Sequence, residues 1–180
     1  MSRRRAPVRA GARTEGAGPD APSAFPAAGT VQIVRAKLHG LRITGSALDY
    51  HGSITLDPDH CDAVGIVPME FVDVWNKHSG ARLSTYVIHG PRGSGCCILN
   101  GAAARTCQVG DAVIICASLT LPLADAHTQR ARVAVFDDEN RIEDLLEYRV
   151  DRDADGRSTF ETVRLRRRGA TRPRGRGRTR

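Results

Sequence analysis

Residues 50–56 read Tyr-His-Gly-Ser-Ile-Thr-Leu, and the interpretation of the whole chain depends on this stretch. The pair Gly52-Ser53 stands at the start of a short apolar-alternating segment, Ser53–Leu56, which predicts a β-strand. A glycine–serine pair by itself is common and usually indicates only a turn. Its meaning therefore has to come from the segments around it.

Further short β-rich segments lie on both sides of this strand. We expect strands at residues 31–38, 71–75, 83–88, 95–99, 112–118 and 131–136. Turn signals separate them, namely Asp57-Pro58, Ser79-Gly80, Gly90-Pro91-Arg92-Gly93 and Gly110-Asp111. Many short strands at close spacing favour a small closed barrel over an open parallel sheet.

Two short helices are expected between the strands. Asp57 can cap a helix that has Pro58 in its first turn. A second helix is expected after Gly101, through residues 102–104. Beyond the barrel, residues 142–148 predict one or two helical turns, and residues 149–155 predict a charged connector.

Composition divides the chain into a folded part, residues 30–141, an N-terminal extension, residues 1–29, and a C-terminal extension, residues 142–180. The net charge of +7 is uneven, because residues 1–29 carry +3, residues 164–180 carry +9 and residues 30–163 carry −5. Residues 1–29 and the Arg/Gly tail, residues 172–178, lack the side chains for a core and are predicted to be disordered. The Arg/Gly tail can bind anionic polymers such as RNA, but a solvated tail is the favoured interpretation.

The cysteines and histidines indicate no metal site. The five cysteines show no C-x-x-C spacing, and the six histidines form no ligand cluster. We therefore expect reduced thiols in a cytoplasmic protein. No apolar run reaches the length of a membrane span. The Arg-rich, acid-poor N-terminus leaves an organelle address open.

Four blocks carry a family resemblance: Lys37-Leu38-His39, residues 48–53 (LDYHGS), Trp75-Asn76 with residues 80–86 (GARLSTY), and residues 92–94 (RGS) with 100–104 (NGAAA). Together, in order and at fixed spacing, they resemble the pyruvoyl-dependent aspartate 1-decarboxylase family, which converts L-aspartate to β-alanine. The resemblance spans roughly 110 residues, to near Arg141. It implies a double-psi β-barrel, assembled as a homotetramer with active sites between subunits.

Decarboxylation of an amino acid leaves a carbanion, which needs an electron sink that ordinary side chains lack. The resemblance implies that the sink is a covalent pyruvoyl group made from Ser53. The Ser53 hydroxyl attacks the Gly52 carbonyl and forms an ester, and β-elimination then leaves dehydroalanine, which hydrolyses to pyruvoyl. The substrate amine forms a Schiff base with this group. Gly52, which lacks a Cβ, tolerates the strained backbone that such a cleavage needs.

The resemblance also assigns roles to other residues. Thr85 stabilises the oxyanion at the cleavage site, and Tyr86 donates a proton to the α carbon. Cationic side chains bind the two substrate carboxylates, and Arg82 and Lys37 are the candidates. The remaining pocket residues are Tyr50, Asn100, Gly101, Ala102 and Ala103.

Adjacent residues on a strand point to opposite faces, and this conflicts with an arrangement in which Thr85 and Tyr86 both line one pocket. A bulge, a strand end, or contributions to two different sites would each resolve this. A second unusual feature is His51, because the family usually has an acidic residue before the Gly-Ser pair. It leaves open a processing-incompetent relative that acts as a non-catalytic partner subunit. A barrel that carries an RNA-binding tail is the other alternative.

Overall fold

The computed structural model describes residues 29–152 and 157–165 of the chain. Its strands form one hydrogen-bonded series in the order β10-β9-β8-β1-β7-β4-β5-β3-β6-β2. The strands are β1 (Thr30–Arg42), β2 (Gly45–Ala47), β3 (Ser53–Leu56), β4 (Phe71–Asn76), β5 (Arg82–His89), β6 (Cys97–Asn100), β7 (Ala112–Pro122), β8 (Arg130–Phe136), β9 (Ile142–Arg152) and β10 (Ser158–Arg164). The helices are α1 (Pro58–Val64) and the 3₁₀ helices η1 (Gly101–Arg105) and η2 (Leu123–Thr128).

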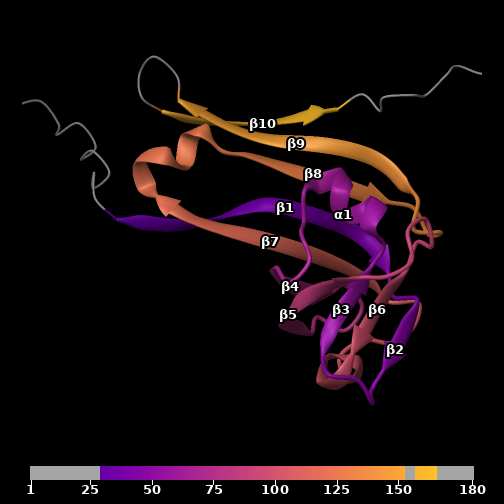
Figure 1. The fold of residues 1–180 in the computed structure, drawn as a ribbon. Helices are drawn as coiled ribbons and strands as arrows, with labels where there is room; N and C mark the ends of the chain where they lie inside the picture. The colour runs from indigo at the N-terminus through magenta and orange to yellow at the C-terminus, as the bar shows by residue number, and fades with distance from the viewer. Residues whose placement is uncertain (1–28, 153–156, 166–180) are drawn as a thin grey trace, which may run out of the picture.

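The strands fall into two groups (Figure 1). Strands β1, β7, β8, β9 and β10 lie side by side, and strands β2 to β6 form a compact group at one end. Strand β3 lies between β5, which is parallel to it, and β6, which is antiparallel. This places the Gly52-Ser53 bond at the entry to a central strand of the compact group.

The mainly β class predicted from the sequence is confirmed. Mixed parallel and antiparallel pairing of short strands fits the small double-psi barrel that the resemblance implies. The hydrogen-bonded series itself is open, with β10 and β2 at its two ends. Fully buried aliphatic side chains from β1, β3, β4, β6 and β7 form the core; the largest include Leu38, Ile54, Val74, Leu99 and Ile115.

The helix predicted after β3 is confirmed, together with its cap. Asp57 accepts a hydrogen bond from the backbone N–H of Asp59 at 2.9 Å, and Pro58 stands in the first turn. Gly65 ends the helix in the left-handed conformation. The helix expected after Gly101 is the short 3₁₀ helix η1.

The prediction for the segment after the barrel was wrong. Residues 142–148 belong to strand β9, which pairs antiparallel with β8, and β9 continues to Arg152 through part of the expected connector. Pairing with the edge of β8 satisfies the β9 backbone, and Ile142 and Leu145 pack against the core. Strands β2 and β10 were not predicted. Disorder was predicted for residues 1–29 and for the Arg/Gly tail, and all of these residues except Gly29 lie outside the described residues.

Candidate active site

The backbone at Gly52-Ser53 has the unusual conformation expected of a strained bond. Gly52 has a φ of +92°, and Ser53, which does have a Cβ, has a φ of +113°. L-residues other than glycine rarely adopt such angles, and the conformation costs on the order of 1–3 kcal/mol unless the surroundings impose it. The Ser53 residue is 1% exposed, so its hydroxyl is held inside the fold.

The buried side-chain amide of Asn100 fixes the Ser53 hydroxyl. Its Nδ2 donates a hydrogen bond to Ser53 Oγ at 2.9 Å and a second one to Thr55 Oγ1 at 2.8 Å. Ser53 and Thr55 are two residues apart on β3, so both side chains point to the same face. Asn100 lies directly opposite Ser53 on β6. The register of two paired strands therefore builds this contact.

Gly101 packs directly against the segment that would be cut. A Cβ at this position would lie 2.8 Å from the Gly52 nitrogen and 2.8 Å from the Tyr50 carbonyl oxygen. Real Cβ atoms essentially never approach backbone atoms so closely, and the φ of Gly101 is +63°. The Asn100-Gly101 turn into η1 therefore needs glycine in order to close on the Gly52 backbone.

A pocket of about 330 Å³ opens beside Ser53. It brings together predicted site residues from three segments: the cleavage site, strand β5 and the turn into η1. Its lining residues are Gly52, Ser53, Leu83, Ser84, Thr85, Asn100, Ala102, Ala103 and Thr106. Thr85 is buried.

Five of the predicted site residues do not line this pocket, namely Tyr86, Arg82, Lys37, Tyr50 and Gly101. Tyr86 packs beside Phe71, with ring centroids 6.2 Å apart. The guanidinium of Arg82 lies 5.0 Å from the centre of the Trp75 ring, a cation–π contact. Lys37 lies on β1, opposite Cys116 of β7.

Strand register places Tyr86, Arg82 and Lys37 on one face of the sheet. Residue pairing from β1 through β7 and β4 to β5 connects Lys37 with Ser84. The neighbouring row of pairs across the same strands connects His39 with Arg82. Paired residues share a face, and residues two apart on a strand share it too. Tyr86 therefore shares this outer face with Arg82, Lys37 and Ser84, of which Ser84 also lines the pocket, whereas Thr85 points to the opposite side.

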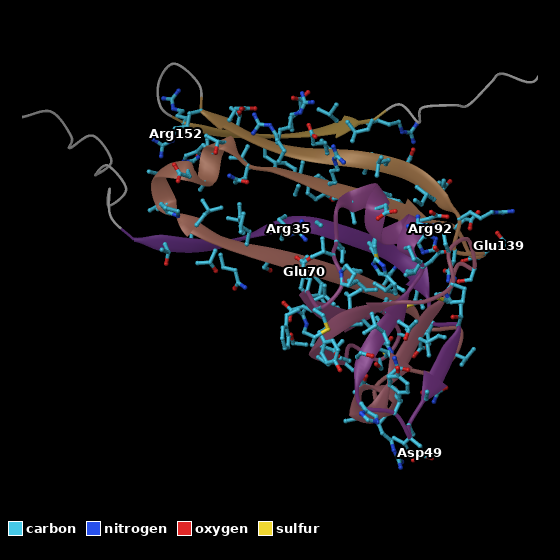
Figure 2. The ribbon with its side chains drawn as sticks, in the orientation of Figure 1. Arg35, Asp49, Glu70, Arg92, Glu139 and Arg152 are labelled. Atoms are coloured by element: carbon cyan, nitrogen blue, oxygen red, sulfur yellow. The ribbon has the colours of Figure 1, made fainter. Side chains whose placement is uncertain are left out.

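The loop before the cleavage site lies at the far tip of the compact group, as the label of Asp49 shows in Figure 2. Tyr50 is 51% exposed and lies edge-on to His51, with ring centroids 5.9 Å apart. His51 is exposed, and neither ring lines the pocket described above. Tyr50 is nevertheless close to the cleavage site, because its carbonyl faces Gly101.

Sequence reasoning missed four residues at this site, namely Thr55, Leu83, Ser84 and Thr106. Thr55 could have been found from its position, two residues after Ser53 on the same strand face. Thr106 lines the pocket from the end of η1, where its hydroxyl donates a hydrogen bond to the carbonyl of Ala103 at 2.7 Å. No sequence signal pointed to that contact.

A buried carboxylate secures the segment that follows β3. Asp57 is 1% exposed and accepts hydrogen bonds from the backbone N–H groups of Gly93 at 3.1 Å and Gly95 at 2.7 Å, besides its bond within the helix cap. Burial alone would raise the pKa of Asp57, but the bonds from Gly95, Asp59 and Gly93 outweigh it and lower the pKa. The Gly93–Gly95 turn is thereby tied to the end of β3.

Among the described residues, no group of three or more His, Cys, Asp or Glu side chains is arranged to hold a metal ion. No helix in the same residues is long and apolar enough to cross a membrane.

The fold and the pocket thus define a small, mainly β protein in which a pocket opens beside one strained Gly-Ser bond. The family model for aspartate decarboxylase matches residues 30–143. Aspartate 1-decarboxylase 2 of Mesorhizobium japonicum is 61% identical over 132 residues, which cover 73% of this chain and 88% of the relative. Aspartate 1-decarboxylase of Xanthobacter autotrophicus is 59% identical over 129 residues, or 72% and 86%. The chain belongs to the aspartate decarboxylase family.

Proposed function

We propose that the chain cuts itself between Gly52 and Ser53 and that the matured protein, a carboxy-lyase, converts L-aspartate to β-alanine and CO2 for pantothenate biosynthesis. The observation that carries the proposal is the geometry of Ser53. Its residue is buried at a φ of +113°, and its hydroxyl is held by Asn100 beside a pocket. A serine that served only as a turn residue would need neither the strain nor the buried partner.

In the cleavage step, Ser53 Oγ forms a bond to the Gly52 carbonyl carbon, and the Gly52–Ser53 C–N bond breaks, so that the amide becomes an ester. The charge that develops on the carbonyl oxygen is stabilised by the Thr85 hydroxyl. β-Elimination then breaks the bond between Cβ and Oγ of residue 53. Gly52 leaves as a carboxylate that keeps the former Ser53 Oγ, and residue 53 becomes dehydroalanine. Water then replaces the nitrogen, which departs as ammonia, and a pyruvoyl group remains at position 53.

The site fits such a group. Ser53 opens onto a pocket that the small side chains of Ala102 and Ala103 leave accessible, and the Asn100 amide supplies a buried N–H donor. When formed, the pyruvoyl group supplies the electron sink for the carbanion left by CO2. Arg82 and Lys37 bind the carboxylates of aspartate, and Tyr86 delivers a proton to the α carbon.

The three predicted residues on the outer face can reach substrate in this pocket if each active site is formed by two subunits. Lys37, Arg82 and Tyr86 lie on the face of the sheet opposite to Thr85, so one subunit would offer the pocket and its neighbour would offer the face. A homotetramer with sites between its subunits accounts for both sets of residues. A cytoplasmic location and the absence of nucleic-acid binding by the barrel belong to the same proposal.

Mass spectrometry of the purified chain tests the proposal. We expect two fragments, residues 1–52 and a larger fragment that carries a pyruvoyl group in place of Ser53 and lacks a free α-amine. Ser53→Ala should stay intact and release no CO2 from aspartate. A wild-type chain that stays intact and inactive after prolonged incubation, or a Ser53→Ala variant that retains activity, would refute it. Intact wild-type chain would also favour the partner-subunit alternative.

A further inference from the structure

Besides its hydrogen bond to Ser53, the Asn100 amide donates a second hydrogen bond to a different residue, Thr55. Nδ2 carries two protons; one is donated to Ser53 Oγ at 2.9 Å and the other to Thr55 Oγ1 at 2.8 Å. Asn100 is 3% exposed, so water is a poor substitute for either partner. Two hydroxyl groups on one strand face thus hold a single amide nitrogen.

The two acceptors differ in what happens to them during the proposed reaction. Ser53 loses its hydroxyl oxygen to the new carboxylate of Gly52, whereas Thr55 keeps its hydroxyl throughout. After cleavage, Thr55 is the partner in this pair that still orients the amide. An Asn side chain can also turn so that its oxygen takes the place of its nitrogen, and only the nitrogen can donate a hydrogen bond.

We propose that Thr55 is a positioning residue, which holds the Asn100 amide so that one N–H points at position 53 both before and after cleavage. This inference rests on the proposed function. Thr55 touches neither the scissile bond nor the substrate in this account and acts through Asn100 alone. The bond is partly buried, and strand pairing on both sides fixes the backbone of its acceptor, since Thr55 pairs with Ile98 on β6 and with Ile88 on β5.

The test compares Thr55→Val, which keeps the shape and removes the hydroxyl, with Thr55→Ser, which keeps the hydroxyl. Loss of this bond leaves a buried N–H unpaired, so Thr55→Val should slow both self-cleavage and aspartate turnover by about tenfold. Thr55→Ser should restore both rates to within about twofold of wild type. Melting temperatures of the two variants show whether loss of folding accounts for any difference.

A double-mutant cycle separates positioning from a general structural role. In an Asn100→Ala background, Thr55→Val should bring no further loss of either rate, because its only target is gone. Two outcomes would overturn the positioning role alone. In one, Thr55→Val lowers both rates by the same factor in the wild-type and in the Asn100→Ala background. In the other, Thr55→Val cleaves and turns over at the wild-type rate. A wild-type chain that neither cleaves nor decarboxylates would instead overturn the proposed function, and the positioning role with it.

A measurement without turnover completes the test. In the uncleavable Ser53→Ala chain, the side-chain N–H resonances of Asn100 report the Thr55 contact by NMR. Thr55→Val should accelerate their hydrogen exchange relative to Thr55→Ser. Equal exchange in the two variants would overturn the contact on which the inference depends.

Discussion

Thr85 and Tyr86 are neighbours on β5 but face opposite sides of the sheet. Thr85 pairs with Val72 on the buried side and lines the Ser53 pocket, whereas Tyr86 pairs with Phe71 and packs beside its ring on the outer side. The β4–β5 pairing contains no register shift, so no bulge there could bring the Thr85 and Tyr86 side chains to the same face. Of the three explanations open from sequence, the regular pairing favours contributions to two different sites.

Two inactive variants should therefore rescue each other. Ser53→Ala lacks the group made at position 53, and Tyr86→Phe lacks the proton donor, so each homotetramer should be inactive. Co-expression in equal amounts should restore about a quarter of the wild-type decarboxylase activity, because mixed neighbours combine an intact pocket with an intact Tyr86. CO2 release by the co-purified, differently tagged subunits is the measurement.

The control for this rescue is co-expression of Ser53→Ala with Thr85→Val. Thr85 and Ser53 line the same pocket, and cleavage of a Thr85→Val subunit should itself be impaired. That pair should therefore stay inactive. If the Ser53→Ala and Tyr86→Phe mixture were equally inactive although mixed tetramers had formed, Tyr86 would act within its own subunit and the two-subunit site would be wrong.

Gly101→Ala should block maturation for a steric reason. Its Cβ would lie 2.8 Å from the Gly52 nitrogen, so the turn into η1 has to move away from the cleavage site. Gly80→Ala is the matched control, because Gly80 also has a positive φ, +75°, but has no atom within 4 Å of its Cβ position. Both variants should lose about 1 kcal/mol of stability from the backbone conformation. Only Gly101→Ala should leave the chain uncut, as judged by mass spectrometry.

Much of this site was predictable because short-range signals and strand register agree there. The segment 53–56 forms the strand predicted for it, and the Asp57 cap begins α1 as expected. These features depend on alternation and capping, which a sequence displays directly. The contact between Asn100 and Thr55 depends instead on which residues face each other across β3 and β6, and one sequence does not display that register.

Residues 142–148 show where local signals mislead. The apolar spacing Ile142-Leu145-Leu146 is compatible with a helical turn, but these residues pair with β8. Long-range pairing overrides a weak local preference when a strand edge is available. The separation of Thr85 from Tyr86 was derived correctly from strand alternation, and the common face of Tyr86, Arg82 and Lys37 needed the order of four strands.

Arg82→Gln should separate substrate binding from maturation. Arg82 lies on the outer face over Trp75, and Ser53 lies on the pocket side, so the chain should still cut itself at the wild-type rate. Loss of a charge-assisted bond to a substrate carboxylate should raise the KM for aspartate about 10- to 100-fold. Steady-state kinetics of the cleaved protein measure the effect.

The control for this prediction is Arg92→Gln. Arg92 is an exposed arginine that forms ion pairs with Asp59 and Asp62, so its loss should leave both maturation and KM unchanged. An unchanged KM in Arg82→Gln would remove Arg82 from the substrate site. A large effect of Arg92→Gln on KM would show that the assay responds to surface charge in general.

Asp57→Asn should destabilise the fold in a pH-dependent way. Asp57 accepts three backbone hydrogen bonds, and its pKa is lower in the folded chain than its ordinary value of 3.8. A carboxyl with a depressed folded pKa stabilises the native state above its unfolded pKa, and this contribution is lost as the pH falls through the folded pKa. The variant should therefore be about 1–3 kcal/mol less stable than wild type at pH 7. Urea unfolding should show this gap narrowing below pH 4, and a gap that stayed constant down to pH 2 would mean that the Asp57 charge contributes nothing.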